Sequence, residues 1–313
     1  SLPLYNAIAG SIKEYLSDPA NNFGGKIDLS YGNHQLAREF IRLDSGEIGH
    51  SGIKTFASYS YGTNAMWMGP GRNRRSHVDA KAVKEWGDGN SARVFMSYTQ
   101  QSTPSFLSLT MAQWKTTGRS GAYYDPTYTP GDYNYWKLNM SQQHSIIIGA
   151  PLVFNLGHGL TFKSAPYYMH IHGAGDNGMT QTEYGYNGTR PTGNLNIPGA
   201  VDGVAPVLGI DVWNQHTAGF NNSLSWKAGH NELEVGYWYN YYDQTEKSPM
   251  AAIGEDGTAT NWWGKYPIKD QYGTPLMQFN IHLIQQVNSL FVSDTYKLFH
   301  DRLTLNAGLK FVM

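Results

Sequence analysis

Two histidines with strand spacing are the residues of this chain best suited to metal chemistry. His170 and His172 flank Ile171, so in an extended strand both imidazoles point to the same face, and Asp176 follows nearby. Two imidazoles on one face can hold a transition metal or a metal complex. The same pair can equally be neutral hydrogen-bonding groups in a lumen or at the base of a loop. We treat them as candidate ligand-binding residues and predict neither a resident metal nor a cofactor.

Aromatic residues crowd two segments that are otherwise rich in Gly, Pro and Asn. Their rings can stack on a sugar or on an aromatic chelate, or they can pack on one another and close the mouth of the loops. The candidates are Tyr123, Tyr124, Tyr128, Tyr133, Tyr135 and Trp136 in the first segment, and Trp262 and Trp263 in the second.

A short basic run, Arg72, Arg74 and Arg75, is expected in a solvated loop. It can attract an anionic ligand, bind lipopolysaccharide phosphates or face water. Because the formal net charge is -1 and no longer run of Lys and Arg occurs, we predict no nucleic-acid partner.

Motifs of enzymatic catalysis are missing from the sequence. Gly49-His50-Ser51-Gly52 is followed by Ile53, which breaks the G-x-S-x-G nucleophile elbow, and Gly69-Pro70-Gly71 lacks the strand-to-helix context of a dinucleotide site. There is no P-loop and no HExxH. With no Cys, thiolate ligands and Cys nucleophiles are excluded. We predict that the protein is not an enzyme and has no catalytic residue.

The composition narrows the fold that carries these candidates. Charged residues make up 15% of the 313 residues, against roughly 25% in typical soluble domains, while aromatics reach 14%. Mean hydropathy is nevertheless negative, so polar and apolar residues must interleave. The longest apolar run, Ile146 to Phe154, is about half of the ~20 residues that a membrane helix needs. Only a closed β-barrel could then span a bilayer.

Strict alternation of apolar and polar residues predicts about eleven strands. In Arg302 to Met313, Leu303, Leu305, Leu309 and others face one way while polar residues face the other. We expect the apolar face outward and Lys, Asn, Ser and Gly inward, and a bulge near Pro166. The predicted strands are 26–31, 35–44, 53–61, 77–86, 93–99, 136–149, 159–172, 217–227, 232–242, 289–299 and 302–313.

The predicted connections alternate between short and long. Short turns fall at 44–51, 87–90, 155–158, 228–231 and 299–301, whereas 62–76, 101–135, 173–212 and 243–274 are long. This layout is typical of outer-membrane barrels with long extracellular loops and short periplasmic turns. Aromatics near strand ends suit interfacial girdles, or the core of a soluble β protein; they are Trp86, Trp136, Trp226, Tyr59 and Tyr241.

Residues 290–311, LFVSDTYKLFHDRLTLNAGLKF, resemble a strand-turn-strand motif of TonB-dependent outer-membrane receptors. In that motif a Phe-x-x-Asp strand leads through Asp-Arg-Leu into a Gly-Leu-Arg/Lys strand. The opening, Ala9-Gly10-Ser11-Ile12 through Asp18-Pro19, is similar to the last plug strand of these receptors. Gly24-Gly25, Tyr31-Gly32, Asp44-Ser45-Gly46 and Trp67-Met68-Gly69-Pro70-Gly71 are similar to their early barrel.

The resemblance implies residues 1–22 as the end of a plug and 23–313 as the N-terminal half of an antiparallel transmembrane barrel of 22 strands. It implies a Gram-negative outer-membrane location, contacts with lipid and lipopolysaccharide, and coupling to the inner-membrane protein TonB through the rest of the plug. The ligand would be a scarce one, of the iron-siderophore, cobalamin or glycan type.

Two other functions fit the residues. A passive porin-like channel needs no plug and no energy coupling. A soluble, aromatic-rich carbohydrate-binding or hydrolase domain requires a second sheet that covers residues such as Leu303, Leu305 and Leu309.

Overall fold

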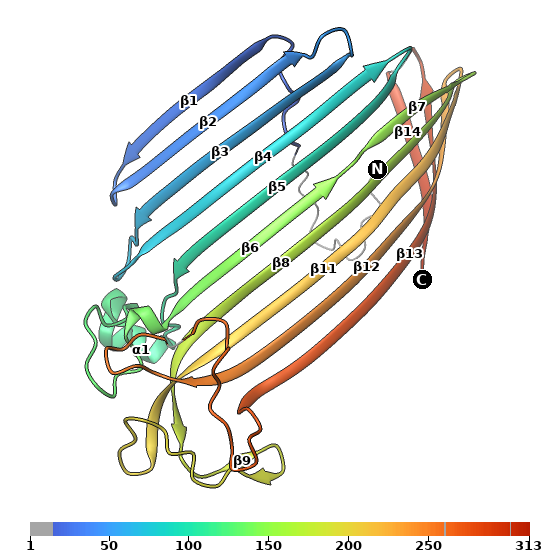
Figure 1. Cartoon of the computed structure of the whole chain (residues 1–313). Coiled ribbons are helices and arrows are strands. Elements are labelled where there is room, and N and C mark those ends of the chain that lie inside the picture. Colours follow the sequence, from blue (N-terminus) through green and yellow to red (C-terminus); the bar gives the residue numbers. More distant parts are fainter. Residues whose placement is uncertain (1–14, 260, 301) are drawn as a thin grey trace.

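A single antiparallel sheet dominates the computed structural model, which describes residues 15–259, 261–300 and 302–313 (Figure 1). Eleven strands follow one another in the order β1-β2-β3-β4-β5-β6-β8-β11-β12-β13-β14, and β7 continues the path of β6 between β5 and β8. The strands are β1 Phe23–Gly32, β2 Leu36–Glu47, β3 Ile53–Ala65, β4 Arg72–Trp86, β5 Asn90–Pro104, β6 Met140–Gly149, β7 Leu152–Gly157, β8 Leu160–Thr182, β11 Val204–Ala228, β12 Asn231–Ala252, β13 Met277–Leu298 and β14 Leu303–Val312. All eleven predicted strands are present, but the one predicted from Trp136 begins only at Met140, because Trp136–Leu138 form a 3-10 turn.

Helices are few and short. They are α1 Met111–Thr117 and the 3-10 turns η1 Gly118–Ala122 and η2 Trp136–Leu138, all between β5 and β6. Within the described ranges, no helix has the length and apolar character needed to cross a membrane. A two-stranded ribbon, β9 Tyr186–Asn187 and β10 Arg190–Pro191, lies between β8 and β11.

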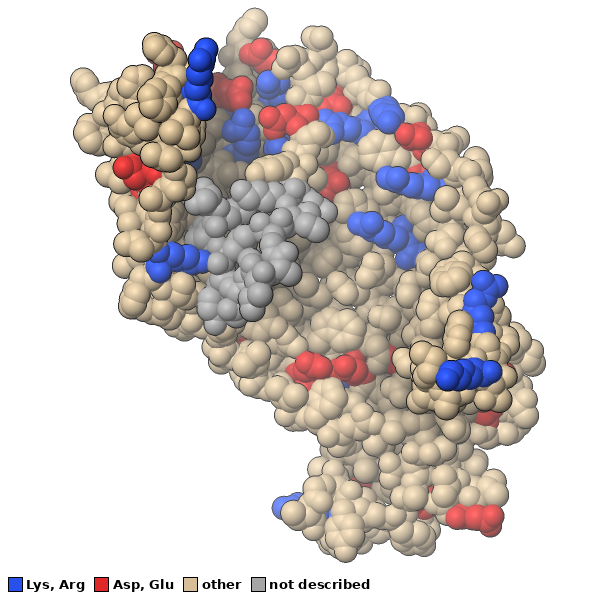
Figure 2. Space-filling model, turned by 180° about the vertical axis from the view of Figure 1, so that it is seen from behind, with Lys and Arg blue, Asp and Glu red and all other residues tan. Residues whose placement is uncertain are grey.

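The sheet curves, and its two faces differ in chemistry. Paired residues share a face, and the face alternates along each strand. We call the face that carries Lys81 the inner face, because the chain segment before β1 lies against it. Figure 2 shows this side as a hollow in which Lys, Arg, Asp and Glu side chains gather.

The outer face is apolar and uncovered. In β13 and β14 the outward side chains include Leu290, Val292, Leu305, Leu309 and Phe311, whose exposed fractions run from 38% to 79%. An open apolar surface of this extent marks contact with a lipid or a partner. The soluble alternative required a second sheet over Leu303, Leu305 and Leu309; in the described part of the chain these residues lie uncovered.

The connections are sorted between the two ends of the sheet. At one end, the turn end, the links are residues 48–52, 87–89, 158–159, 229–230 and 299–302. At the other, the loop end, the links 105–139, 183–203 and 253–276 are long. The predicted long connection at 62–76 is wrong, because β3 and β4 extend through it and leave only residues 66–71.

Two other expectations fail for related reasons. The bulge near Pro166 is absent, since β8 pairs with β11 in unbroken register from Leu160 to Thr182. β8, β11 and β12 also run well past their predicted ends, into segments expected to be loops. The β8 extension, 173–182, is rich in Gly, and the β11 extension from Val204 is apolar on both faces, so neither shows a clear alternation of polar and apolar residues.

The densely packed core lies at the loop end. There the link 105–139 and the link 253–276 pack on the extended parts of β8, β11 and β12 around Leu138, Ala174, Leu208, Ile210 and Ala251. A smaller cluster joins Ile197, Ala205 and Val207. Protein, namely these links, therefore covers the outer face of the sheet extensions here.

The two edge strands, β1 and β14, run in the same direction, because each step along the eleven-strand path reverses direction. Joining these edges directly would need a parallel pair. An all-antiparallel closed barrel therefore requires an odd number of further strands between β14 and β1.

Candidate functional site

The segment before β1 is held against the inner face by a network of charged groups. Lys81 Nζ donates to the Leu16 carbonyl oxygen at 2.8 Å and pairs with Asp18 Oδ1 at 2.6 Å. Arg42 donates to Ser17 Oγ at 2.5 Å and to the Asp18 carbonyl oxygen at 3.0 Å. We call Leu16 to Asn21, with its partners on β2 to β5, the anchor.

The anchor continues toward β1 through backbone and side-chain contacts. The Ala20 amide donates to Asp44 Oδ1 at 2.8 Å, and Lys54 Nζ donates to Asn21 Oδ1 at 2.9 Å. Arg93 Nε lies 3.8 Å from Asp18 Oδ1, and Arg93 Nη2 donates to Glu85 Oε1 at 2.9 Å. Pro19 is buried within this network. The segment is thus fixed to the wall over several residues before the first strand begins.

Asp18 is the titratable centre of the anchor. The hydrogen bond from Lys81 lowers the pKa of the Asp18 carboxyl below its ordinary value; partial burial opposes this, and the charges of Lys81, Arg93 and Lys54 support it. A carboxyl whose folded pKa is depressed stabilises the folded contact above its unfolded pKa of about 3.9, and this contribution is lost as pH falls through the folded pKa.

We expect the anchor to loosen only below about pH 4. Because the chain has no Cys, a nitroxide on Ala20→Cys reports the mobility of the segment without background labelling. Its electron paramagnetic resonance spectrum should sharpen below that pH. In the Asp18→Asn variant the nitroxide should be mobile at every pH. A spectrum that changes neither with pH nor with the Asp18→Asn substitution would contradict this role of Asp18.

Beside the anchor lies an inner cavity of about 690 Å³. Asp18, Lys81 and Arg93 form its polar side, and Phe95 and Ile147 belong to its apolar side. The two cations already contact Asp18, so the cavity offers little free charge. We interpret it as the space between anchor and wall.

The two predicted histidines share a face, as expected, but it is the outer one. The His170 ring stacks on His216 with centroids 4.4 Å apart, and its Nε2 lies 2.6 Å from Asn214 Oδ1. His172 stacks on Trp263 at 4.5 Å. The parallel rings do not converge on one point, and the described residues contain no group of three or more potential metal ligands.

Asp176 lies farther along the same strand, under the link 105–139. Its carboxylate is buried, with 4% of the residue exposed, and neither oxygen has a hydrogen-bond partner. The next residue on this face is Gly178, whose missing side chain leaves room for the Tyr133 carbonyl oxygen. Asp176 lies about 53 Å along β8 from Leu160, which is a height of roughly 40 Å for a strand tilted by about 40° and exceeds a bilayer's ~25 Å apolar band. Here burial raises the pKa of Asp176 to about 8.

The predicted loop aromatics are brought together mainly by contacts among themselves. The ring centroids of Tyr128 and Tyr135 are 5.6 Å apart, and those of Tyr135 and Trp136 are 6.3 Å apart. Trp263 packs against the same cluster. Tyr123 borders Gly69. Tyr133 is 40% exposed, and Tyr124 and Trp262 are half-buried. Ligand contact by these residues stays a prediction.

Arg72 and Arg74 lie on β4 instead of in a loop, because the strand begins at Arg72. Their positions fall on the outer face, where Arg72 contacts Gln35 at 2.5 Å and Thr63 at 3.2 Å. Side chains alternate along β4, so Arg75 faces inward, where its guanidinium lies 3.5 Å from His77 Nδ1. The placement of Arg72 and Arg74 favours anions at the outside of the wall over a ligand inside it.

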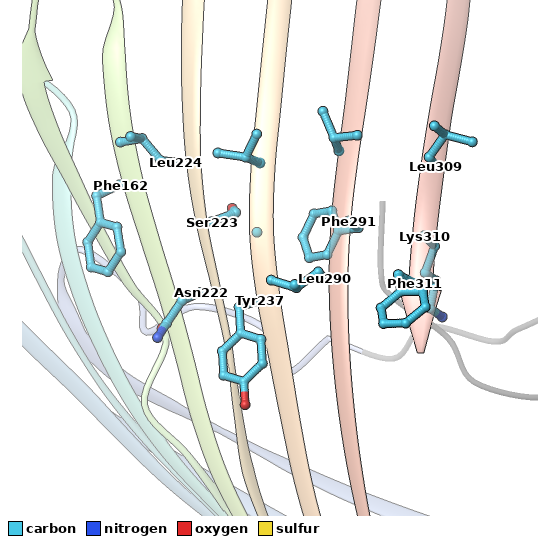
Figure 3. A pocket seen from close by; sticks show the side chains of 13 residues that line it. Phe162, Asn222, Ser223, Leu224, Tyr237, Leu290, Phe291, Leu309, Lys310 and Phe311 are labelled. Atoms are coloured by element: carbon cyan, nitrogen blue, oxygen red, sulfur yellow. The ribbon is translucent and has the colours of Figure 1, made fainter. Parts of the chain in front are cut away.

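A hollow of about 760 Å³ is distant from these groups and crosses β8 and β11 to β14. Its aliphatic lining consists of residues on the outer face, among them Leu224, Leu290 and Leu309, while Ser223 and Lys310 come from the inner one (Figure 3). We assign this groove to the apolar band and not to a ligand site.

Comparison with known proteins decides the fold. No protein-family model and no curated protein matches the chain. Among solved structures, the chain resembles the ferripyoverdine receptor of the outer membrane of Pseudomonas aeruginosa, with a TM-score of 0.62, 14% identity, and coverage of 95% of this chain and 38% of that one. It is similar to the ferric-catecholate import receptor Fiu of E. coli K12, with a TM-score of 0.61, 11% identity, and coverage of 96% and 42%.

The chain has the fold of a receptor barrel. The ferric citrate transporter FecA gives the same result, with a TM-score of 0.60, 13% identity and coverage of 95% and 38%. The resemblance to TonB-dependent receptors predicted from the sequence is thereby confirmed for the fold. The chain spans about two fifths of the length of the structures it matches.

Several residues with clear structural roles were not predicted from the sequence. Lys81, Arg93 and Arg42 are single cations in separate strands, and only the fold brings them to one segment. Trp213 lies between the predicted loop 173–212 and the predicted strand 217–227, and the structure places it on the inner face of β11. The cations that face inward on β2, β4 and β5 are the sequence feature from which the anchor could have been predicted.

Proposed function

We propose that this protein is part of an outer-membrane receptor that imports a scarce ligand by energy-coupled transport. The anchor carries the proposal: a segment fixed along the inner face before the first strand suits the end of a plug that fills the barrel, and a passive pore has no need of it. The similar proteins of known structure include siderophore receptors, which supports a receptor over a general channel.

The two faces of the sheet support membrane insertion. The outer face presents aliphatic side chains, as the lipid-facing side of a barrel must, while the inner face carries the charged and amide residues of a polar lumen. In this arrangement the turn end is periplasmic and the loop end is extracellular, so the loops 105–139, 183–203 and 253–276 meet the ligand first. Lipid and lipopolysaccharide surround the wall, and TonB acts through the plug.

Residues 1–22 are then the end of the plug and 23–313 the first half of the barrel. The expected plug strand runs from Ala9 to Pro19; residues 9–14 lie outside the described residues, and residues 15–19 form no strand. Asp301 of the terminal motif also lies outside the described residues. The number of strands agrees with this division. Eleven further strands, an odd number, would complete a barrel of 22 in which all neighbouring strands are antiparallel.

Uptake in whole cells tests the proposal against a passive channel. Cells with and without the intact gene would be given ⁵⁵Fe-labelled ferric chelates and ¹⁴C-labelled oligosaccharides, in a host with and without TonB. We expect gene-dependent uptake of at least one probe that vanishes without TonB. Gene-dependent uptake that survives the loss of TonB would establish the porin-like alternative.

A further inference from the structure

A row of inner-face residues crosses the extracellular half of the wall. The Cα register pairs Gln143 of β6 with Gly173 of β8, Gly173 with Trp213 of β11, and Trp213 with Glu246 of β12. Paired residues share a face, so the four side-chain positions lie side by side on the lumen surface. Beyond Gln143 the row continues through Gln101 of β5.

Trp213 forms a flat aromatic surface in this row because two glycines on β8 make space for it. A Cβ added to Gly173 would lie 2.2 Å from the Trp213 ring, and one added to Gly175 would lie 3.6 Å from it. The indole therefore rests directly over the β8 backbone. The half-buried ring leaves its other side toward the lumen.

Polar side chains with spare hydrogen-bonding capacity border the ring. On β12, the Tyr242 hydroxyl donates to Gln244 Oε1, and Gln244 Nε2 donates to Glu246 Oε2 at 2.8 Å. On β11, Asp211 Oδ1 is buried and has no hydrogen-bond partner, and burial together with the neighbouring Glu246 carboxyl raises the pKa of the Asp211 carboxyl. Asp211 pairs in register with Gly175, so its carboxylate lies next to the Trp213 platform.

The charge of this surface selects among ligands. Asp211 and Glu246 are acidic, and the first inner-face cation in the same row is Arg75, paired with Gln101. Arg75 lies four strand spacings from Trp213, about 19 Å at 4.8 Å per spacing. An anionic ferric chelate would find two acidic side chains here and, in this row of the described strands, no cation nearer than Arg75, which disfavours it.

An aromatic ring flanked by carboxylates, amides and a hydroxyl suits a ligand with an apolar face and a rim of hydroxyl groups. Stacking on the ring contributes contact area, and acceptors such as Asp211 and Glu246 satisfy hydroxyl donors. We propose that this surface binds a neutral, polyhydroxylated ligand, a short oligosaccharide, with Trp213 as the stacking platform. The proposal rests on the proposed function only in taking the inner face as the ligand path.

Binding by the purified protein in detergent micelles tests the inference. The probes are maltoheptaose, cellopentaose and chitotriose, measured by isothermal titration calorimetry. We expect at least one to bind, and Trp213→Ala to weaken its affinity at least about tenfold. Trp226→Ala, on the outer face of the same strand, is the matched control and should leave the affinity unchanged. Gly173→Ala should weaken binding too, because the new methyl group displaces the ring.

Two further measurements separate a sugar from a charged ligand. Glu246→Gln keeps a hydrogen-bonding group, so oligosaccharide affinity should fall only a few fold. Ferrioxamine B, a cationic chelate, and ferric citrate, an anionic one, are the competing probes. Tighter binding of either chelate than of every oligosaccharide would overturn the proposal, as would an unaffected Trp213→Ala variant or no oligosaccharide binding at all.

Failure of this inference and failure of the proposed function give different results. Loss of sugar binding with intact TonB-dependent uptake of a ferric chelate would refute the oligosaccharide site alone. Sugar binding that depends on Trp213, combined with uptake that persists without TonB, would refute energy coupling and leave the site standing.

Discussion

Replacing Asp176 by asparagine should stabilise the packing of the loop end by about 2–4 kcal/mol at pH 7, because it removes a carboxylic acid buried without a partner. The native acid has a pKa of about 8 in the folded protein, against about 3.9 unfolded. The folded state therefore holds its proton more tightly. Stability contributed by this group is full below about pH 4 and declines until about pH 8.

The pH dependence distinguishes this effect from a general gain in stability. The difference in thermal midpoint between Asp176→Asn and the native protein should be small at pH 4 and large at pH 8, measured in detergent. Asp88→Asn, in an exposed turn, is the control and should behave like the native protein. A gain that is equal at both pH values would mean that Asp176 titrates normally.

The second large effect concerns the orientation of the sheet in the membrane. Val292 lies on the outer face of β13, paired with Val235 and Leu309, about 15 Å from the turn end and so near the middle of the apolar band. Val292→Arg should destabilise the inserted protein by about 2–4 kcal/mol. Unfolding by urea in phospholipid vesicles measures the change.

The neighbouring residue provides the matched control. Ser293 points to the inner face and pairs with Glu234 and Gly308, so Ser293→Arg places the same charge in a polar lumen. Its free energy of unfolding should change by less than about 1 kcal/mol. Equal costs for the two variants, or a larger cost for Ser293→Arg, would show that the apolar face does not contact lipid.

Local alternation was sufficient to predict the strands but not their lengths. Leu303, Leu305 and Leu309 alternate with polar neighbours, and β14 follows their pattern closely. In β11 the residues from Val204 to Val212 form a strand although they were expected in a loop. Their alternation is weak because loop residues cover the outer face there, so neither face needs a consistent hydropathy.

The candidate site shows the same limit at the level of single residues. Sequence spacing placed His170 and His172 on one face correctly, yet which face that is depends on the curvature of the whole sheet. The aromatic loop residues were recognisable as candidates, whereas their packing onto β8 and β11 came from chain segments far apart in the sequence. Trp213 and the anchor cations had no local signal.

By itself, the sequence determined the class of the protein: an all-β chain with alternating faces, sorted connections and no catalytic motif, because side-chain alternation and turn composition are local properties of the chain. The tertiary structure alone decided which side is the lumen, how Lys81 and Arg42 hold the segment before β1, and how Gly173 seats Trp213. Those features depend on register between strands, which sums small pairing preferences over the entire sheet and cannot be read from any one segment.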